Sequence, residues 1–235
     1  MRHALSLSLL VALSAGCASL PIKVPEPFSA LQIPQEAVIS IIHKTPYSIG
    51  RFTGNGFFFG DKNCFFITYH QHKSLQKGSF QIYPQKEADS LEFLYAKVEF
   101  DLAIYRANGL RGPVRALTLI KEIYHPQPGE ELLILSRLRV SKTVRVSNQV
   151  DKIVIPLPGS MIKEGIEEFK GIIFIDYLVW GEVEAGQSGS PLLNKNGKVI
   201  GIMHTAALEG PMPRPSFAIP LSQRLLEDIF KEINC

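Results

Sequence analysis

The sequence has 235 residues, of which 46% are hydrophobic and 20% are charged, as in ordinary globular proteins. This length suits one two-lobed unit or one large all-β domain. The net charge of +3 is small, and the lysines and arginines are scattered without basic runs or interleaved aromatic residues. These features exclude the charge pattern of nucleic-acid-binding proteins, so we expect no nucleic-acid partner.

Residues 1–16 are typical of a secretory signal peptide, because a basic start precedes an apolar stretch at 4–13 and small residues follow it. Cys17 then stands where a bacterial lipoprotein signal places the cysteine that is lipidated and becomes the new N-terminus. Leucine usually stands three residues before that cysteine, but this chain has Ser14, so ordinary secretion stays open as the alternative. Either route predicts a protein of the bacterial cell envelope, lipid-anchored or secreted, on the periplasmic or outer-membrane side. The lipid anchor would be its contact with the membrane.

Residues 17–36 are predicted to form a lipidated N-terminus and tether in front of a domain at 37–235. The tether holds four prolines, which break helices and favour an extended chain: Pro21, Pro25, Pro27 and Pro34.

Cys64 and Cys235 are the thiols that remain if Cys17 carries lipid. An oxidising envelope permits them to pair, but the sequence gives no sign that they come within bridging distance. We therefore expect them to be unpaired. The sequence also holds no CxxC pair and no HExxH, so we expect no metal site, and no other cofactor is implied.

Short apolar or alternating segments bounded by Gly, Pro, Asn or Lys predict two sets of β-strands. The first set is 37–43, 56–59, 64–68, 79–83, 91–98 and 102–106; the second is 131–138, 144–150, 153–155, 172–179, 191–193, 198–205 and 216–220. Two groups of about six strands predict an all-β fold of two six-stranded antiparallel β-barrels, at about 37–115 and about 125–220. One convincing helix is expected, at 222–234. Ser222 can cap it, and its apolar face is predicted to pack on the second barrel.

The turn 186–191 reads Gly-Gln-Ser-Gly-Ser-Pro and predicts a nucleophilic serine, Ser188. A serine attacks only if a base takes its proton and donors await the developing oxyanion, and the small neighbours leave room for both. An α/β-hydrolase is excluded, because that turn needs glycine at the place of Ser190 and needs an acid between the serine and a later histidine. His204 follows Ser188 with no Asp or Glu between them, so the base must lie upstream.

Asp101 is the upstream candidate for the acid of a triad, because it stands at the head of the apolar stretch 102–105. A triad carboxylate must be largely buried to hold a histidine in one tautomer, and a flanking apolar strand provides that burial. The alternative is an acid at a strand edge that faces water.

Four segments together resemble the chymotrypsin-fold serine proteases, in particular the bacterial branch of glutamyl endopeptidases and HtrA proteases. They are Thr-Gly-Asn-Gly-Phe-Phe-Phe at 53–59, Phe-Phe-Ile-Thr-Tyr-His at 65–70, Asp-Leu-Ala-Ile at 101–104 and the serine turn at 186–191. The resemblance extends from about Ala37 to the C-terminus. It implies a chymotrypsin-like double barrel with a cleft that takes a peptide or protein substrate. It also implies an oxyanion hole from the N–H groups of Gly186 and Ser188, with Asp101 orienting a histidine.

The histidine departs from the family pattern of Thr, two residues, then His, because Gln71 stands at that place. Either Ile67 takes the place of the threonine and His70 is the base, or one residue is inserted and His72 is the base. We prefer His70 because it needs no insertion. The departure leaves a second hypothesis open, in which the protein is a catalytically inactive, protease-like lipoprotein that binds peptides or an envelope partner.

Glu182, Glu184 and His204 are candidates for the substrate pocket that the resemblance implies. Either acid would favour a basic side chain, and both fit solvated loop acids equally well. His204 lies near the pocket histidine of glutamyl-specific relatives, but Met203 intervenes and would place His204 on the other face of a regular strand.

Overall fold

The structure is a computed structural model. It describes residues 28–45, 48–75, 79–83, 88–110, 114–122, 129–137, 142–146, 153–155, 172–174, 177–180, 186–206, 215–221 and 223–235, with Val24, Glu26, Tyr124, Pro126 and Gln127. The predicted signal peptide, Cys17, Glu182, Glu184 and Ser222 lie outside the described residues. Within those residues, no helix is both long enough and apolar enough to cross a membrane.

The first lobe is a six-stranded sheet in the order β4-β1-β2-β3-β6-β5, with each neighbouring pair antiparallel. Its strands are β1 (Val38–Thr45), β2 (Ser48–Phe59), β3 (Cys64–Thr68), β4 (Ser79–Tyr83), β5 (Ser90–Lys97) and β6 (Leu102–Asn108). Aromatic residues fill its interior: the ring centroids of Phe57 and Phe66 lie 5.4 Å apart, and those of Phe59 and Phe66 lie 4.0 Å apart. These buried rings come from the Phe-rich segments of β2 and β3, which pair along the sheet.

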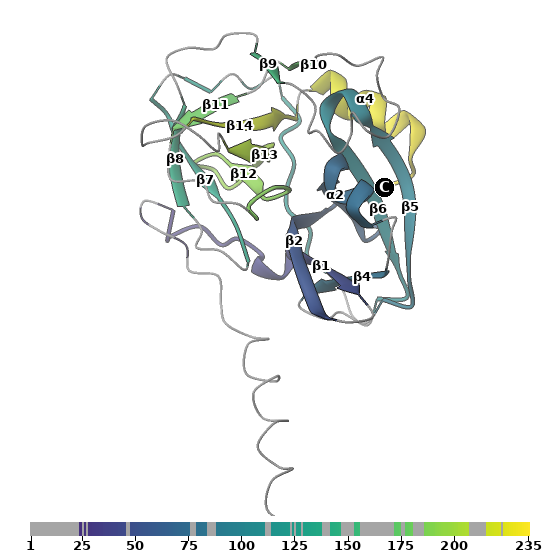
Figure 1. Cartoon of the computed structure of the whole chain (residues 1–235). Helices are drawn as coiled ribbons and strands as arrows, with labels where there is room; N and C mark the ends of the chain where they lie inside the picture. The colour runs from purple at the N-terminus through teal and green to yellow at the C-terminus, as the bar shows by residue number, and fades with distance from the viewer. Residues whose placement is uncertain are drawn as a thin grey trace, which may run out of the picture.

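The second lobe is a closed six-stranded barrel in the order β11-β14-β13-β12-β7-β8. Its strands are β7 (Glu131–Ile134), β8 (Lys142–Val146), β11 (Tyr177–Trp180), β12 (Pro191–Leu193), β13 (Val199–Ala206) and β14 (Pro215–Pro220). A separate pair, β9 (Ile153–Ile155) and β10 (Ile172–Phe174), forms a two-stranded ribbon. Figure 1 shows the two lobes beside each other, and the predicted all-β, chymotrypsin-like fold is confirmed.

Several elements differ from the prediction, among them one predicted strand and one helix. The prediction of one strand at 172–179 is wrong, because this segment contributes two strands, β10 and β11, which belong to different sheets. A short helix, α2 (Tyr69–Leu75), follows β3 directly, where we expected none. It is short and follows an apolar strand, so it carries no helical periodicity of its own.

The C-terminal helix α4 (Gln223–Glu232) is present, but it packs on the first lobe, and the prediction of the second barrel is wrong. The ring of Phe230 lies 6.0 Å from that of Phe59, and Asp228 forms an ion pair with Lys97 of β5 at 3.6 Å. Figure 1 shows α4 beside β5 and β6. The apolar stripe of the helix is visible in the sequence, but the lobe that it covers depends on the path of the chain.

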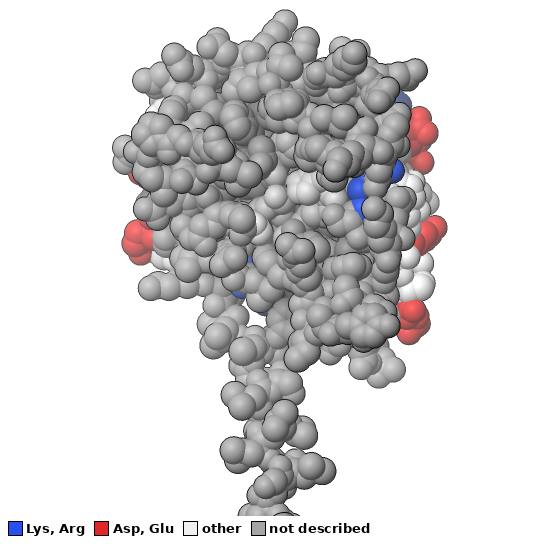
Figure 2. Space-filling view, in the orientation of Figure 1, with Lys and Arg blue, Asp and Glu red and all other residues white. Residues whose placement is uncertain are grey.

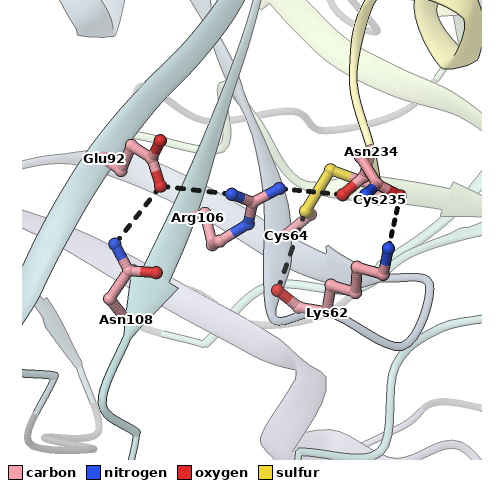
Figure 3. Close-up of a disulfide and its surroundings, with 7 residues drawn as sticks. All are labelled: Lys62, Cys64, Glu92, Arg106, Asn108, Asn234 and Cys235. Atoms are coloured by element: carbon pink, nitrogen blue, oxygen red, sulfur yellow. Dashed lines mark hydrogen bonds and ion pairs between the residues drawn. A yellow bond between two sulfur atoms is a disulfide. The ribbon is translucent and has the colours of Figure 1, made fainter.

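Cys64 and Cys235 form a disulfide, with a Cα–Cα distance of 5.9 Å, so the expectation that they are unpaired is wrong. Packing of α4 on the first lobe brings the C-terminus to the start of β3. The two cysteines are far apart in the sequence, so the sequence does not reveal this contact. Figure 3 shows the surrounding contacts: Arg106 donates to the carbonyl oxygen of Asn234 at 2.8 Å, and Lys62 bonds the side chain of Asn234. The disulfide therefore fixes the end of α4 to the first lobe.

The packed chain begins before the boundary that we expect at Ala37. Phe28 is 2% exposed and belongs to the same core as α4 and the first sheet, and Leu31 and Ile33 pack against that core. Figure 2 shows acidic side chains near α4 and β5, set among separate basic ones. On that face, the described residues form no continuous patch of one charge sign.

Candidate functional site

His70 is fixed at the start of α2 by two hydrogen bonds to one carboxylate. Its backbone N–H donates to Asp101 Oδ1 at 2.8 Å, and its ring Nδ1 lies 2.6 Å from Asp101 Oδ2. The preceding N–H, of Tyr69, donates to the Asp101 carbonyl oxygen at 2.7 Å. The side chain of His70 is 27% exposed, so the ring is held from one side and accessible from the other.

Asp101 lies between the short 3-10 turn Val98–Phe100 and β6, with its backbone in the left-handed region at φ 48°. A non-glycine residue there is strained, and such strain gathers at functional sites. The residue is 3% exposed. Burial alone would raise the pKa of Asp101, but the charge of His70 and hydrogen bonds from His204 and His70 lower it to about 2. The carboxylate therefore stays ionised unless the pH falls toward 2.

His204 approaches the same carboxylate from the second lobe. Its Nε2 lies 2.9 Å from Asp101 Oδ2, and the residue is 4% exposed. The pairing of β13 with β14 shifts register between Met203 and Thr205, so His204 is the extra residue of a β-bulge. A bulge redirects a side chain, which is why the alternation of a regular strand gives the wrong face for His204.

The ligand-type atoms of His70, Asp101 and His204 lie within 4.8 Å of one another. Such a group resembles a metal centre, but both imidazoles contact Oδ2 directly at hydrogen-bonding distance. We interpret the cluster as a hydrogen-bonded carboxylate shared by two histidines.

The serine turn before β12 depends on two glycines with positive φ, Gly186 at 95° and Gly189 at 79°. The hydroxyl of Ser188 donates to the carbonyl oxygen of His204 at 3.0 Å. Ser188 therefore lies beside the His70–Asp101–His204 cluster, and its hydroxyl must turn toward His70 before it can donate a proton there.

Asn55 of β2 holds the backbone of this turn from the first lobe. It is fully buried, and its Nδ2 donates to the carbonyl oxygen of Gly186 at 2.9 Å, while its N–H donates to that of Ser188 at 2.8 Å. Among the described residues, the N–H groups of Gly186 and Ser188 donate to no acceptor. The predicted oxyanion donors are therefore compatible with the backbone of the turn.

Gln71 also links the two sides of the site. It accepts hydrogen bonds from Thr68 and donates to the carbonyl oxygens of Asn55 and Ser188. Local sequence patterns point to no role for Gln71 or Asn55. The one available signal was a glutamine at the place where the family pattern puts histidine.

His72 lies apart from this cluster. Its Nδ1 is 2.6 Å from the hydroxyl of Tyr105, and its ring stacks on those of Phe93 and Tyr69, with centroids 4.6 and 5.3 Å away. The structure thus brings together His70, Asp101, Ser188 and His204, and it places His72 against β5 and β6. Glu182 and Glu184 lie outside the described residues, and pocket roles for them and for His204 stay predictions.

Comparisons with known proteins agree with this fold. A family model described as a trypsin-like peptidase domain matches residues 54–202, more than half of the chain. The active form of the Rv3671c protease from M. tuberculosis is 17% identical, with a TM-score of 0.62, over 92% of this chain and 90% of that one. The inactive form is 16% identical, with a TM-score of 0.58, over 92% and 100% of the two chains. At these identities the likeness shows the fold alone. No curated protein sequence matches the chain.

Proposed function

Because the chain belongs to the trypsin-like peptidase family, we propose that it is a serine endopeptidase that uses Ser188, His70 and Asp101. The observation that carries this proposal is the 2.6 Å contact between His70 Nδ1 and buried Asp101 Oδ2. A carboxylate there keeps the proton of neutral His70 on Nδ1 and leaves Nε2 with a lone pair. That lone pair is the base that a serine nucleophile needs.

The proposed reaction follows from these positions. Ser188 Oγ attacks the peptide carbonyl carbon as its proton moves to His70 Nε2, and the carbonyl oxygen becomes an oxyanion that the N–H groups of Gly186 and Ser188 bind. The C–N bond then breaks, and His70 returns the proton to the leaving amine. Water, losing a proton to His70, attacks the acyl carbon, the ester bond to Ser188 Oγ breaks, and His70 returns the proton to Ser188 as the acid product leaves. Asp101 stabilises the imidazolium in both halves.

One observation favours the second candidate, a catalytically inactive protein that binds peptides or an envelope partner in the same cleft. In the structure the Ser188 hydroxyl donates to the His204 carbonyl oxygen, and His70 Nε2 lies 3.2 Å from the hydroxyl of Thr68. Both reacting groups are thus held by other partners. A serine hydroxyl changes rotamer readily, and the family match supports a peptidase, which is why we favour the enzyme.

The substrate class and the location are proposed from the family, the sequence and the disulfide. A protease of this family acts on peptides or proteins. The branch of glutamyl endopeptidases and HtrA proteases, and pocket roles for Glu182 and Glu184, rest on the sequence. The Cys64–Cys235 disulfide supports an oxidising compartment, in keeping with a secreted or Cys17-lipidated envelope protein.

An activity-based fluorophosphonate probe tests the proposal, because it phosphonylates a serine only when a base activates the hydroxyl. We expect the full-length protein to be labelled and Ser188→Ala to remain unlabelled. A folded wild-type protein that takes no label would eliminate the enzyme and leave the binding protein.

Two histidine variants then identify the base. His70→Ala should lower the labelling rate by at least about a thousandfold, as loss of a triad member does in related chemistry. His72→Ala should label within about tenfold of wild type, because His72 contacts Tyr105 rather than Asp101. The reverse ranking would assign the base to His72.

A further inference from the structure

Gln71 is nearly inaccessible, at 1% exposure, and makes four hydrogen bonds through its side-chain amide. It lies beside His70 on α2 and reaches across to the turn that carries Ser188. The main chain of the serine turn in the second lobe is therefore hydrogen-bonded to the base-bearing segment of the first lobe through this side chain.

The orientation of the amide follows from its partners. The N–H of Thr68 can only donate, and it lies 2.8 Å from Oε1. The carbonyl oxygens of Asn55 and Ser188 can only accept, and they lie 3.3 and 3.2 Å from Nε2. One half of the amide is thus an acceptor toward β3, and the other half is a donor toward the serine turn.

The acceptor half of Gln71 also bears on His70. The hydroxyl of Thr68 donates its only proton to Oε1 at 2.8 Å, so its oxygen, 3.2 Å from His70 Nε2, can accept a hydrogen bond from Nε2 once that atom has taken the proton of Ser188. His70 Nε2 is the atom that must accept the proton of Ser188. Gln71 therefore contacts the backbone of the nucleophile directly and the base through Thr68.

Two glycines make room for the amide. A Cβ on Gly54 would lie 2.0 Å from Gln71 Nε2, and a Cβ on Gly189 would lie 2.0 Å from the carbonyl oxygen of Asn55 and 2.8 Å from Gln71 Oε1. Real Cβ atoms do not approach so closely, so a larger residue at Gly54 would displace Gln71, and one at Gly189 would collide with both Asn55 and Gln71. The site is built around this side chain, from β2, β3 and the serine turn together.

We propose that Gln71 is a positioning residue that sets His70 Nε2 against Ser188 across the two lobes. This inference rests on the proposed function, because it concerns the proton transfer between those two groups. Hydrogen bonds to the Ser188 carbonyl fix the main chain of the nucleophile, and those to Thr68 fix the neighbour of the base. Loss of this link changes the distance between the reacting atoms and leaves the substrate cleft itself in place.

The test measures phosphonylation by a fluorophosphonate probe as a maximal rate, kinact, and a half-saturating concentration, KI. Gln71→Met keeps the length of the side chain and removes every hydrogen bond. We expect kinact to fall about 10- to 100-fold, the effect of a misplacement of about 1 Å, and KI to stay within about threefold. A loss confined to KI, or no loss in either constant, would overturn the inference.

Gln71→Glu separates positioning from simple packing. The ionised carboxylate still accepts from Thr68 but faces two carbonyl oxygens without a donor, so kinact should fall as far as in Gln71→Met. Burial raises the pKa of a carboxyl group, and a protonated glutamic acid regains a donor. The ratio of the Gln71→Glu rate to the wild-type rate should therefore rise as the pH falls, whereas the Gln71→Met ratio stays flat. The titratable groups linked to this site, His70, Asp101 and His204, are present in every variant, and the uncharged Gln71→Met protein is the reference against which the pH profile of Gln71→Glu is compared.

Three further proteins complete the test. Gln223→Met makes the same change on the exposed surface of α4 and should leave kinact unchanged. Thr68→Val removes the hydroxyl link alone and should lower kinact about three- to tenfold, and this variant decides the question if the Gln71 variants do not fold by circular dichroism. Ser188→Ala gives the background level of labelling. Absence of labelling in wild type would reject the proposed function, whereas a labelled wild type with Gln71 and Thr68 variants within twofold of it would reject only this inference.

Discussion

One carboxylate oxygen of Asp101, Oδ2, accepts hydrogen bonds from the rings of two histidines, His70 and His204. The oxygen lies between a ring that is 27% exposed, His70, and one that is buried, His204. Only His70 is accessible enough to meet a substrate. We therefore interpret His204 as support for Asp101, since a buried carboxylate needs donors at each oxygen to stay ionised and fixed.

Replacement of His204 tests that support. His204→Ala removes a hydrogen bond to a buried charge, and such bonds contribute about 1.5–3 kcal/mol, so we expect the labelling rate to fall about tenfold. His204→Gln retains an N–H donor near the position of Nε2 and should recover most of the rate. Measurement of kinact for the three proteins provides the comparison.

The proton NMR resonance of His70 Nδ1–H gives an independent check, measured in a Ser188→Ala background where no reaction occurs. His204→Ala should move this resonance, because the acceptor Oδ2 loses its second donor, and His204→Gln should restore it. An unmoved resonance with an unchanged rate would show that His204 only fills space.

The β-bulge at His204 also shows what sequence periodicity leaves out. Strand alternation assumes one residue per pleat, and the register shift between Met203 and Thr205 breaks that assumption. No residue in this segment marks the bulge, so the contact with Asp101 could not be predicted from the chain. By contrast, Ser188, Asp101 and His70 could be proposed because each occurs in a local motif.

At the scale of elements, α2 explains why His70 and His72 have different surroundings. In an extended strand, residues two apart share a face, whereas in a helix they point in nearly opposite directions. The single turn of α2 thus directs His70 toward Asp101 and His72 toward Tyr105. The different surroundings of the two histidines thus come from a helix that the sequence does not predict.

His72 makes stability depend on pH. Burial, and then the charge of Lys73, lower the pKa of His72 below 6.5, while burial raises the pKa of Tyr105 to about 12, so Tyr105 stays protonated and can donate to Nδ1. The unfolded chain binds a proton on this histidine near pH 6.5, and the folded chain binds it at a lower pH. The contribution of His72 is therefore complete above that pH and is lost as the pH falls, with a limiting slope of about 1.4 kcal/mol per pH unit.

Urea unfolding between pH 7.5 and 5.5 measures this slope for wild type and His72→Asn, which keeps a polar group without titrating. We expect the free energy of unfolding to decline more steeply with acid in wild type. Equal slopes would mean that His72 keeps its ordinary pKa in the folded protein. Labelling by the probe is measured on the same samples, so that loss of fold and loss of the base are kept apart.

Strands with clear boundaries are the elements that sequence patterns predict well. The segments 64–68, 79–83, 153–155 and 191–193 are strands with the predicted bounds, because each is a short apolar or alternating segment closed by turn residues. The first half of β2 was missed, since Ser48–Gly54 holds polar residues and two glycines and shows no apolar run. Its pairing with β1 supplies the stability that its own residues do not indicate.

At the scale of the whole molecule, the proposed site exists only where the two lobes meet. His70 and Asp101 come from segments next to β3 and β6, whereas Ser188 and His204 come from the turn before β12 and from β13. Asn55 and Gln71 join the two sets by hydrogen bonds between residues far apart in the chain. Two barrels can be predicted from strand count, but these bridges depend on how the lobes dock, which no local pattern encodes.

The Cys64–Cys235 disulfide closes a loop over a sequence separation of 171 residues and holds α4 on the first lobe. A cross-link over so long a loop restricts the unfolded chain strongly, and chain-entropy estimates give about 3–5 kcal/mol of stabilisation. We expect the double variant Cys64→Ala/Cys235→Ala to unfold at a correspondingly lower urea concentration than wild type. The rate kinact should stay within about twofold, because the disulfide contacts none of the groups that hold Ser188 or His70.

Reduction of the wild-type protein is the matched control for that prediction. A reductant should lower the unfolding midpoint of wild type to that of the double variant and leave the double variant unchanged, since it then has no disulfide to lose. Equal midpoints for oxidised and reduced wild type would show that packing of α4 alone fixes the C-terminus. The apolar stripe of Leu225, Leu226, Ile229 and Ile233 is buried in the core, so some helix should persist after reduction. The fall in midpoint therefore measures the cross-link rather than the loss of α4, and circular dichroism at zero urea distinguishes the two.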